Sequence, residues 1–247
     1  MFERIPAAFM IDEALFGKCD MPEFIGCTLL DTIGLLIPSV SPALHKEIGL
    51  PADIHALGLI SSRTGAAGQI LACDEAVKMT NTRVISVELP RDTKGWGGHG
   101  NYIVMGGETV DDARSAVEQA LRLIERNAGE VYISDAGHLE FAYSARAGQA
   151  LHMAFGAPEK RAFGFMAASP AAIGMVIADR ALKSSGVELI TYMSPSRKTS
   201  HSNEVIIVFT GDAADVKNAV LTGRECGMKL LTAMGSLPLS PGRPYIE

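Results

Sequence analysis

Hydrophobic and polar residues follow one pattern twice along this chain. Residues 56–60 alternate between the two faces of an extended segment, and a mostly apolar helical face follows and ends near Lys78. The same order recurs at residues 162–166 and continues to Lys183. Alternation predicts a half-buried strand, and apolar positions three to four residues apart predict a helix. Because the copies lie about 105 residues apart, too far for a solenoid repeat, the pattern predicts two related domains.

Each copy continues with the same further elements. Asn81 and Gly186 end the two helices, and the next strands are predicted at 84–87 and 187–192 and then at 102–105 and 205–209. A second helix is predicted at 109–126 in the first copy, and its counterpart opens at the acidic residues Asp212 and Asp215. Strand, helix, strand, strand, helix is most of a ferredoxin-like unit, whose helices cover one face of an antiparallel sheet. The fold class is therefore predicted to be α+β.

Several segments carry a family resemblance. ALGLISSR followed by CDEAVK, with ADRALK in the second copy, resembles the bacterial microcompartment shell domain, and two copies in one chain resemble the tandem-domain, trimer-forming shell proteins. Six segments more closely resemble shell proteins of propanediol-utilisation microcompartments: FIGCTLLDTIGL, DEAVKMTNT, ELPRDTKGWGGHG, AGHLEFAYSARA, SNEVIIVFTGD and RPYI. The resemblance implies two tandem ferredoxin-like shell domains that are circularly permuted relative to single-domain members.

The chain divides into three predicted parts. Residues 1–22 form an N-terminal extension, 23–134 the first shell domain and 135–247 the second. The extension lacks the basic region, apolar run and cleavage site of a secretory signal. Its apolar residues could make a short amphipathic face, which either docks on its own domain or, as the family's extension suggests, contacts enzymes inside the shell.

Two polar loops hold the side chains that are expected to be most exposed and able to bind small molecules. The first, PRDTKGWGGHG, has no phosphate-binding GxxxxGK[ST] motif, so no nucleotide or other cofactor is expected. Its glycines suit either a plain connection between strands or a pore-lining loop that approaches a symmetry axis closely. The candidate pore or loop residues are Trp96, Gly97, Gly98, His99, Asn101, Ser200, His201 and Asn203.

Lysines and histidines give further candidates for residues that make contacts at tile edges or at a junction. Lys78 and Lys183 occupy the same place in both copies, and the resemblance implies contacts between neighbouring tiles at their edges. His138 and Glu140, where the second copy begins, are expected to make hydrogen bonds at a junction or interface, with a pore-lining role as the alternative. Combinations of His99, His138 or His201 with Glu140 or Glu204 have no spacing typical of a catalytic or metal site.

Composition and charge limit the kinds of partner and environment that are expected for the chain. The net charge is −6, and no cluster of Lys and Arg forms a basic stripe, so nucleic acid is not an expected partner. The most apolar window, at 162–178, is interrupted by Ser169, Pro170 and Gly174, so no membrane-spanning helix is expected. Four cysteines without paired spacing indicate reduced thiols rather than disulfides or metal ligands.

The resemblance and the residues together predict a non-enzymatic tile of a bacterial microcompartment shell in the cytoplasm. The tile would be a homotrimer with pseudo-sixfold symmetry that packs beside other shell proteins and lets small polar metabolites, such as diols or glycerol, cross. One alternative is a metabolite-binding regulatory protein of paired ferredoxin-like domains. Another is an enzyme with a site at His138 and Glu140.

Overall fold

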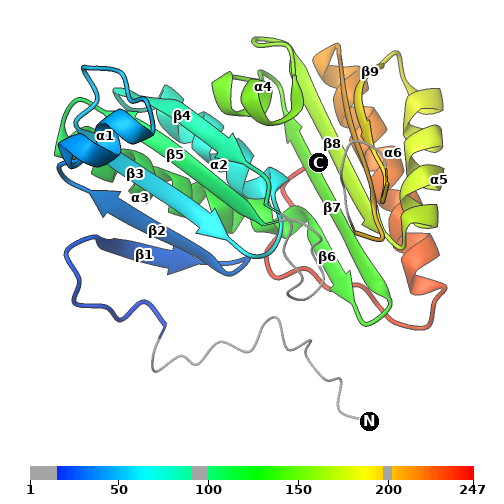
Figure 1. The fold of residues 1–247 in the computed structure, drawn as a ribbon. Helices are drawn as coiled ribbons and strands as arrows, with labels where there is room; N and C mark the ends of the chain where they lie inside the picture. Colours follow the sequence, from blue (N-terminus) through cyan, green and yellow to red (C-terminus); the bar gives the residue numbers. More distant parts are fainter. Residues whose placement is uncertain (1–15, 91–99, 197–201) are drawn as a thin grey trace.

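The computed structural model describes residues 16–90, 100–196 and 202–247. These ranges form two five-stranded antiparallel sheets, one in each half of the chain, and Figure 1 shows the two halves side by side. Long helices pack on one face of each sheet. The prediction of an α+β fold with two related domains is confirmed. The amphipathic face expected within residues 1–15 lies outside the described residues.

The first domain contains five strands and three α-helices in the described residues. Its sheet has the strand order β1-β2-β3-β5-β4. The elements are β1 (Phe24–Thr28), β2 (Thr32–Ile37), α1 (Pro42–Glu47), β3 (Ala56–Ser62), α2 (Ala67–Lys78), β4 (Thr82–Glu88), β5 (Asn101–Gly107) and α3 (Val110–Asn127).

The second domain repeats this arrangement, with the strand order β6-β7-β8-β10-β9. A 3-10 turn, η2 (Ala128–Glu130), links it to the first domain. Its elements are β6 (Val131–Ser134), β7 (Gly137–Ser144), α4 (Gln149–Phe155), β8 (Ala162–Ser169), α5 (Ala171–Ser184), β9 (Glu188–Met193), β10 (Val205–Gly211) and α6 (Ala213–Thr232).

Local chemistry explains several element boundaries. Helix α3 begins after Thr109, whose hydroxyl accepts the Asp112 N–H, and acidic residues occupy its first turn, where they complement the helix dipole. Gly58 in β3 allows α3 to pack closely on the sheet, because a Cβ at this position would lie 2.6 Å from the Val117 side chain. Edge strands β4 and β9 each contain a bulge at the equivalent place. The duplication therefore extends to an irregularity of the backbone.

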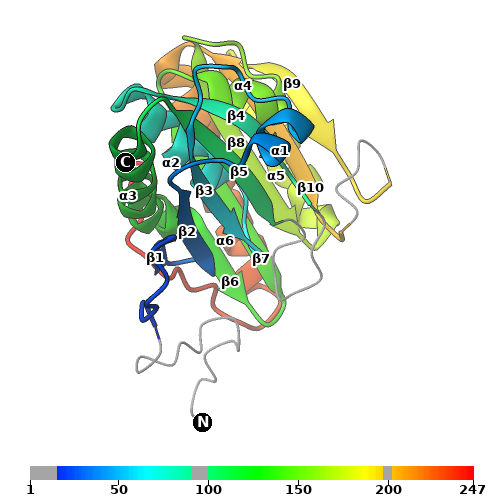
Figure 2. The same cartoon turned by 60° about the vertical axis from the view of Figure 1, so that its left-hand side comes forward.

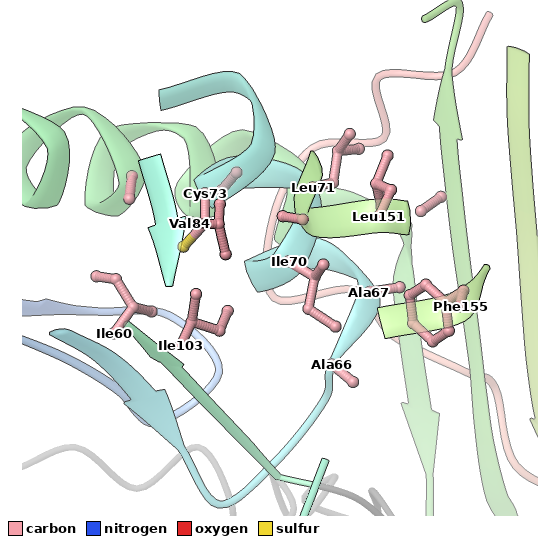
Figure 3. Close-up of a cluster of buried hydrophobic side chains, with 14 of the residues drawn as sticks. Ile60, Ala66, Ala67, Ile70, Leu71, Cys73, Val84, Ile103, Leu151 and Phe155 are labelled. Atoms are coloured by element: carbon pink, nitrogen blue, oxygen red, sulfur yellow. The ribbon is translucent and has the colours of Figure 1, made fainter. Parts of the chain in front are cut away.

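The main hydrophobic core is continuous across both domains. Ile70 and Leu71 of α2 pack in one cluster with Leu151 and Phe155 of α4, as Figure 3 shows. The Phe155 ring lies 5.4 Å from that of Phe165 in β8, centroid to centroid. The boundary between the domains is thus part of one continuous hydrophobic core.

The C-terminal segment also joins the two domains. After α6 it returns to the region between them, and its end lies near α3 in Figure 2. The ring of Tyr245 packs under the Arg126 guanidinium of α3, 5.2 Å from its centroid, and the Tyr245 hydroxyl lies beside the backbone of Tyr143 in β7. This segment contacts elements of both domains.

Candidate functional site at the domain junction

Asp74 connects the first domain to the second. This fully buried carboxylate of α2 accepts the N–H groups of Gly148 and Ala150, each at 2.9 Å, and that of Leu151 at 3.4 Å. Lys78, one turn along α2, donates to Asp74 at 2.7 Å and to the Arg146 carbonyl at 2.8 Å. Charged acceptors form strong bonds to otherwise unpaired N–H groups at the start of a helix. Asp74 therefore fixes α4 against α2.

Glu140 makes the reciprocal connection from the second domain to the first. One oxygen of its buried carboxyl, on β7, faces the N–H groups of Ala66, Ala67 and Gly68 at the start of α2, at 3.2, 2.9 and 3.4 Å. Burial raises the pKa of Glu140 above its ordinary value, while the Ala66 N–H and the nearby His138 act in the opposite direction. Each domain thus supplies a carboxyl that completes a helix start in the other.

A second buried polar pair lies beside Glu140. His138 Nε2 is 3.1 Å from Glu204 Oε2, and both side chains are almost completely buried. Ser202 donates to the other Glu204 oxygen at 2.5 Å. The described residues contain no group of three or more His, Cys, Asp or Glu side chains placed to hold one metal ion.

These carboxyls border a hollow between the domains. It is narrow, with a free volume of about 20 Å³, which is room for about one water molecule. Glu140 and Glu204 line it together with mostly apolar residues: Gly65, Ala66, Leu89, Phe155, Phe165, Ala167, Met193 and Ile206.

Comparison with known proteins identifies the fold. The BMC domain model matches residues 56–135 and again 162–238. The bacterial microcompartment shell protein PduB of Citrobacter freundii is 46% identical over 229 residues, which cover 93% of this chain and 85% of that protein. This chain belongs to the BMC-domain family of bacterial microcompartment shell proteins.

Solved structures of shell proteins agree with this assignment. A crystal structure of a trimeric bacterial microcompartment shell protein PduB has a TM-score of 0.86 and 46% identity, and the match covers 91% of this chain and all of that one. EtuB from Clostridium kluyveri gives a TM-score of 0.88 and 47% identity over 92% of this chain and all of that one. The similarities support a shell protein rather than the metabolite-binding regulator.

The structure places two of the pore or loop candidates. Asn101 is buried at the start of β5 and donates to the Ser62 hydroxyl at 2.8 Å and the Gly65 carbonyl at 3.5 Å. Asn203 is exposed and accepts the N–H of Ala171, where α5 begins. The other candidates, Trp96, Gly97, Gly98, His99, Ser200 and His201, lie outside the described residues. The pore assignment of this shell protein stays a prediction.

The two repeated lysines differ in their surroundings. Lys78 is partly covered by the internal contact with Arg146, whereas Lys183 is largely exposed and donates at 2.7 Å to Asp179, which is exposed too.

No helix in the described part of this shell protein is long and apolar enough to cross a membrane.

Sequence reasoning missed two functional residues of the junction. Asp74 was not singled out, although Asp179 at the same place in the second copy was a signal that this position is repeated. Glu130 in η2 was not singled out, yet its buried carboxylate accepts the N–H groups of Tyr245 and Ile246, each at 2.8 Å, and Arg224 at 2.9 Å. No local pattern reveals these bonds, because their partners lie about a hundred residues away in the chain.

The raised pKa of Glu140 predicts a pH-dependent stability. Between the unfolded and folded pKa values, the folded protein holds a proton that the unfolded chain has lost. The contribution of this carboxyl is therefore fully present below the unfolded pKa and declines as pH rises through the folded pKa, by up to about 1.4 kcal/mol per pH unit. Urea unfolding measures the free energy of unfolding of the protein and of its Glu140→Gln variant. As pH rises from the unfolded to the folded pKa of Glu140, this free energy should fall in the unmodified protein relative to the variant.

The neighbouring charges do not obscure this comparison. His138 and Glu204 face Glu140 from β7 and from the segment before β10, and both residues are present in the unmodified protein and in the variant. The difference between the protein and its Glu140→Gln variant therefore reports mainly on Glu140. A free-energy difference that stays constant from about pH 4 to about pH 8 would contradict the prediction.

Proposed function

We propose that three copies of this chain form a flat, pseudo-hexagonal tile in the facet of a bacterial microcompartment shell, beside other shell proteins. The observation that carries the proposal is the likeness, over 91% of the chain, to a PduB described as trimeric. Two domains in each of three copies supply six related sectors, and a closed ring repeats one head-to-tail contact. The role is structural, and no reaction is assigned to the chain.

Small polar metabolites, such as diols or glycerol, would cross this tile through passages that select by size and hydrogen bonding. Such a passage would open at the hollow of the domain junction, where Glu140 and Glu204 place hydrogen-bonding groups in an otherwise apolar wall. The candidate loops at 96–101 and 200–203 would line a passage around the symmetry axis. Residues 1–22 would contact encapsulated enzymes.

Light scattering and electron microscopy test the tile. The protein should have the mass of three chains in dilute solution and form ordered layers as its concentration rises. Lys183→Ala should keep the mass of three chains and weaken layer formation, if this lysine lies where tiles meet. An unmodified protein with the mass of one chain at all concentrations would overturn the tile. A Lys183→Ala variant with the mass of one chain would instead place Lys183 at the contact within the ring.

A further inference from the structure

A hollow lies between helices α5 and α6 of the second domain, which pack side by side in Figure 1. Its free volume is about 270 Å³, far more than one water molecule needs, so it can admit a side chain. We call it the α5–α6 hollow. One residue of α5 and five of α6 line it: Arg180, Thr222, Glu225, Cys226, Lys229 and Leu230.

Helices α2 and α3 form the corresponding surface in the first domain. Glu75 of α2 aligns with Arg180 of α5 at the spacing of the two copies. The buried positions of α3 recur at one constant spacing in α6, which aligns Arg126 with Lys229. These buried positions are 113, 116, 117, 120 and 124 in α3 and 216, 219, 220, 223 and 227 in α6. Glu75 and Arg126 therefore mark the place in the first domain that matches the α5–α6 hollow.

The chain itself occupies this place in the first domain. Glu75 and Arg126 form an ion pair at 2.7 Å, and the Tyr245 ring packs against the Arg126 guanidinium. Tyr245 also packs against the main hydrophobic core. Among the described residues, no side chain from another segment fills the α5–α6 hollow. The second domain thus repeats the binding place without its occupant.

Charge distinguishes the α5–α6 hollow from its counterpart. Because Arg180 replaces Glu75, two cations, Arg180 and Lys229, border the hollow together with one carboxylate, Glu225. Glu225 pairs with Lys229, which leaves the positive charge of Arg180 in excess. The half-buried side chain of Leu230 adds apolar surface. A ligand that fits both features combines an aromatic side chain with a carboxylate.

We propose that residues 1–15 of a neighbouring copy bind in the α5–α6 hollow, as the C-terminal segment binds in the first domain. A phenylalanine would lie against Lys229, as Tyr245 lies against Arg126, and a carboxylate would face Arg180. The segment contains two phenylalanines and three acidic residues: Phe2, Glu3, Phe9, Asp12 and Glu13. Its composition matches both the apolar and the charged part of the hollow.

The start of β1 brings this segment to the neighbouring copy. Glu130, directly before β6, accepts the N–H of Tyr245, so the occupied place in the first domain adjoins the start of the second domain. In the proposed tile of six related sectors, the α5–α6 hollow adjoins the start of the next copy's first domain in the same way. Figure 1 shows β1 and α5 of one copy at opposite ends of the molecule. This inference rests on the proposed tile and gives residues 1–15 a binding place on it, besides the encapsulated enzymes.

The thiol of Cys226 reports whether the hollow is filled. Its rate of alkylation by N-ethylmaleimide, followed by mass spectrometry, should rise about tenfold when Phe2 and Phe9 are both replaced by alanine. Phe16→Ala is the matched control, since Phe16 is exposed and lies just outside the segment. The buried Cys73 should stay unlabelled in every folded variant. An unchanged Cys226 rate in the double variant would overturn the inference.

A disulfide identifies the copy that supplies the segment. In a protein with Phe9→Cys and with the exposed Cys19 replaced by serine, mild oxidation should link position 9 to Cys226 of another copy. Non-reducing gels should then show linked chains, and an additional Cys226→Ser change should abolish them. A link within one chain would contradict binding between neighbouring copies.

Light scattering separates this inference from the tile on which it rests. An unmodified protein with the mass of one chain would defeat the tile itself. A mass of three chains, together with an unchanged Cys226 rate in the double variant, would overturn only the binding of residues 1–15 in the hollow.

Discussion

Replacing Asp74 with alanine is expected to lower the free energy of unfolding by about 3 kcal/mol. The substitution leaves the N–H groups of Gly148, Ala150 and Leu151 without their acceptor, and those of Ala150 and Leu151 are buried. It also removes the charge that holds Lys78. Urea unfolding followed by circular dichroism would measure the loss. Because the contact lies within one chain, the loss should be the same at all protein concentrations.

Asp179→Ala is the matched control for this experiment. Asp179 occupies the same place in the second copy but is exposed. Because its side chain is exposed, its loss should lower the free energy of unfolding by less than about 0.5 kcal/mol. An equal loss in both variants would show that the buried contacts of Asp74 contribute little.

Replacing Gly129 with alanine is expected to displace the C-terminal segment and cost about 2–3 kcal/mol. A Cβ at Gly129 would lie 1.8 Å from the carbonyl oxygen of Arg243, so the backbone on one side must move. The movement would pull Tyr245 and Ile246 away from Glu130. Carboxypeptidase digestion followed by mass spectrometry should then remove residues 243–247 much faster than in the unmodified protein.

Two further variants separate this effect from a general loss of stability. Gly68→Ala puts a methyl group in α2 at ordinary contact distance, 3.6 Å from Asn127, and should leave digestion unchanged. Glu130→Ala removes the anchor of the segment without adding bulk and should accelerate digestion as Gly129→Ala does. Slow digestion in both Gly129→Ala and Glu130→Ala would show that the segment is held by other contacts.

The elements of the fold were predictable because their signals are local. The predicted helix at 109–126 differs from α3 by one residue at each end, since Thr109 caps the helix that it precedes. Predicted strands at 84–87 and 102–105 fall inside β4 and β5. Duplication helped further, because each copy supported the assignment in the other. The pairing of strands followed from neither signal, since it depends on contacts between distant segments.

The junction was much harder to predict. In the sequence, Asp74 and Lys78 look like a solvated pair one helical turn apart, as Asp179 and Lys183 are in the structure. Asp74 differs because its carboxylate accepts hydrogen bonds from backbone N–H groups that lie 74 to 77 positions later in the chain. Periodicity reports which face of a helix is apolar but not which element covers it. The family resemblance supplied the assembly, and the local pattern alone did not.

The anchored C-terminal segment has a consequence for the order of synthesis. Residues 243–246 leave the ribosome only after every strand of both sheets, and both domains can begin folding before then. Until Tyr245 reaches Arg126 and the backbone reaches Glu130, the junction lacks part of its packing. While a nascent chain is still on the ribosome, the contacts between its two domains would therefore be incomplete. The domains would reach their final packing only after residues 243–246 have been translated.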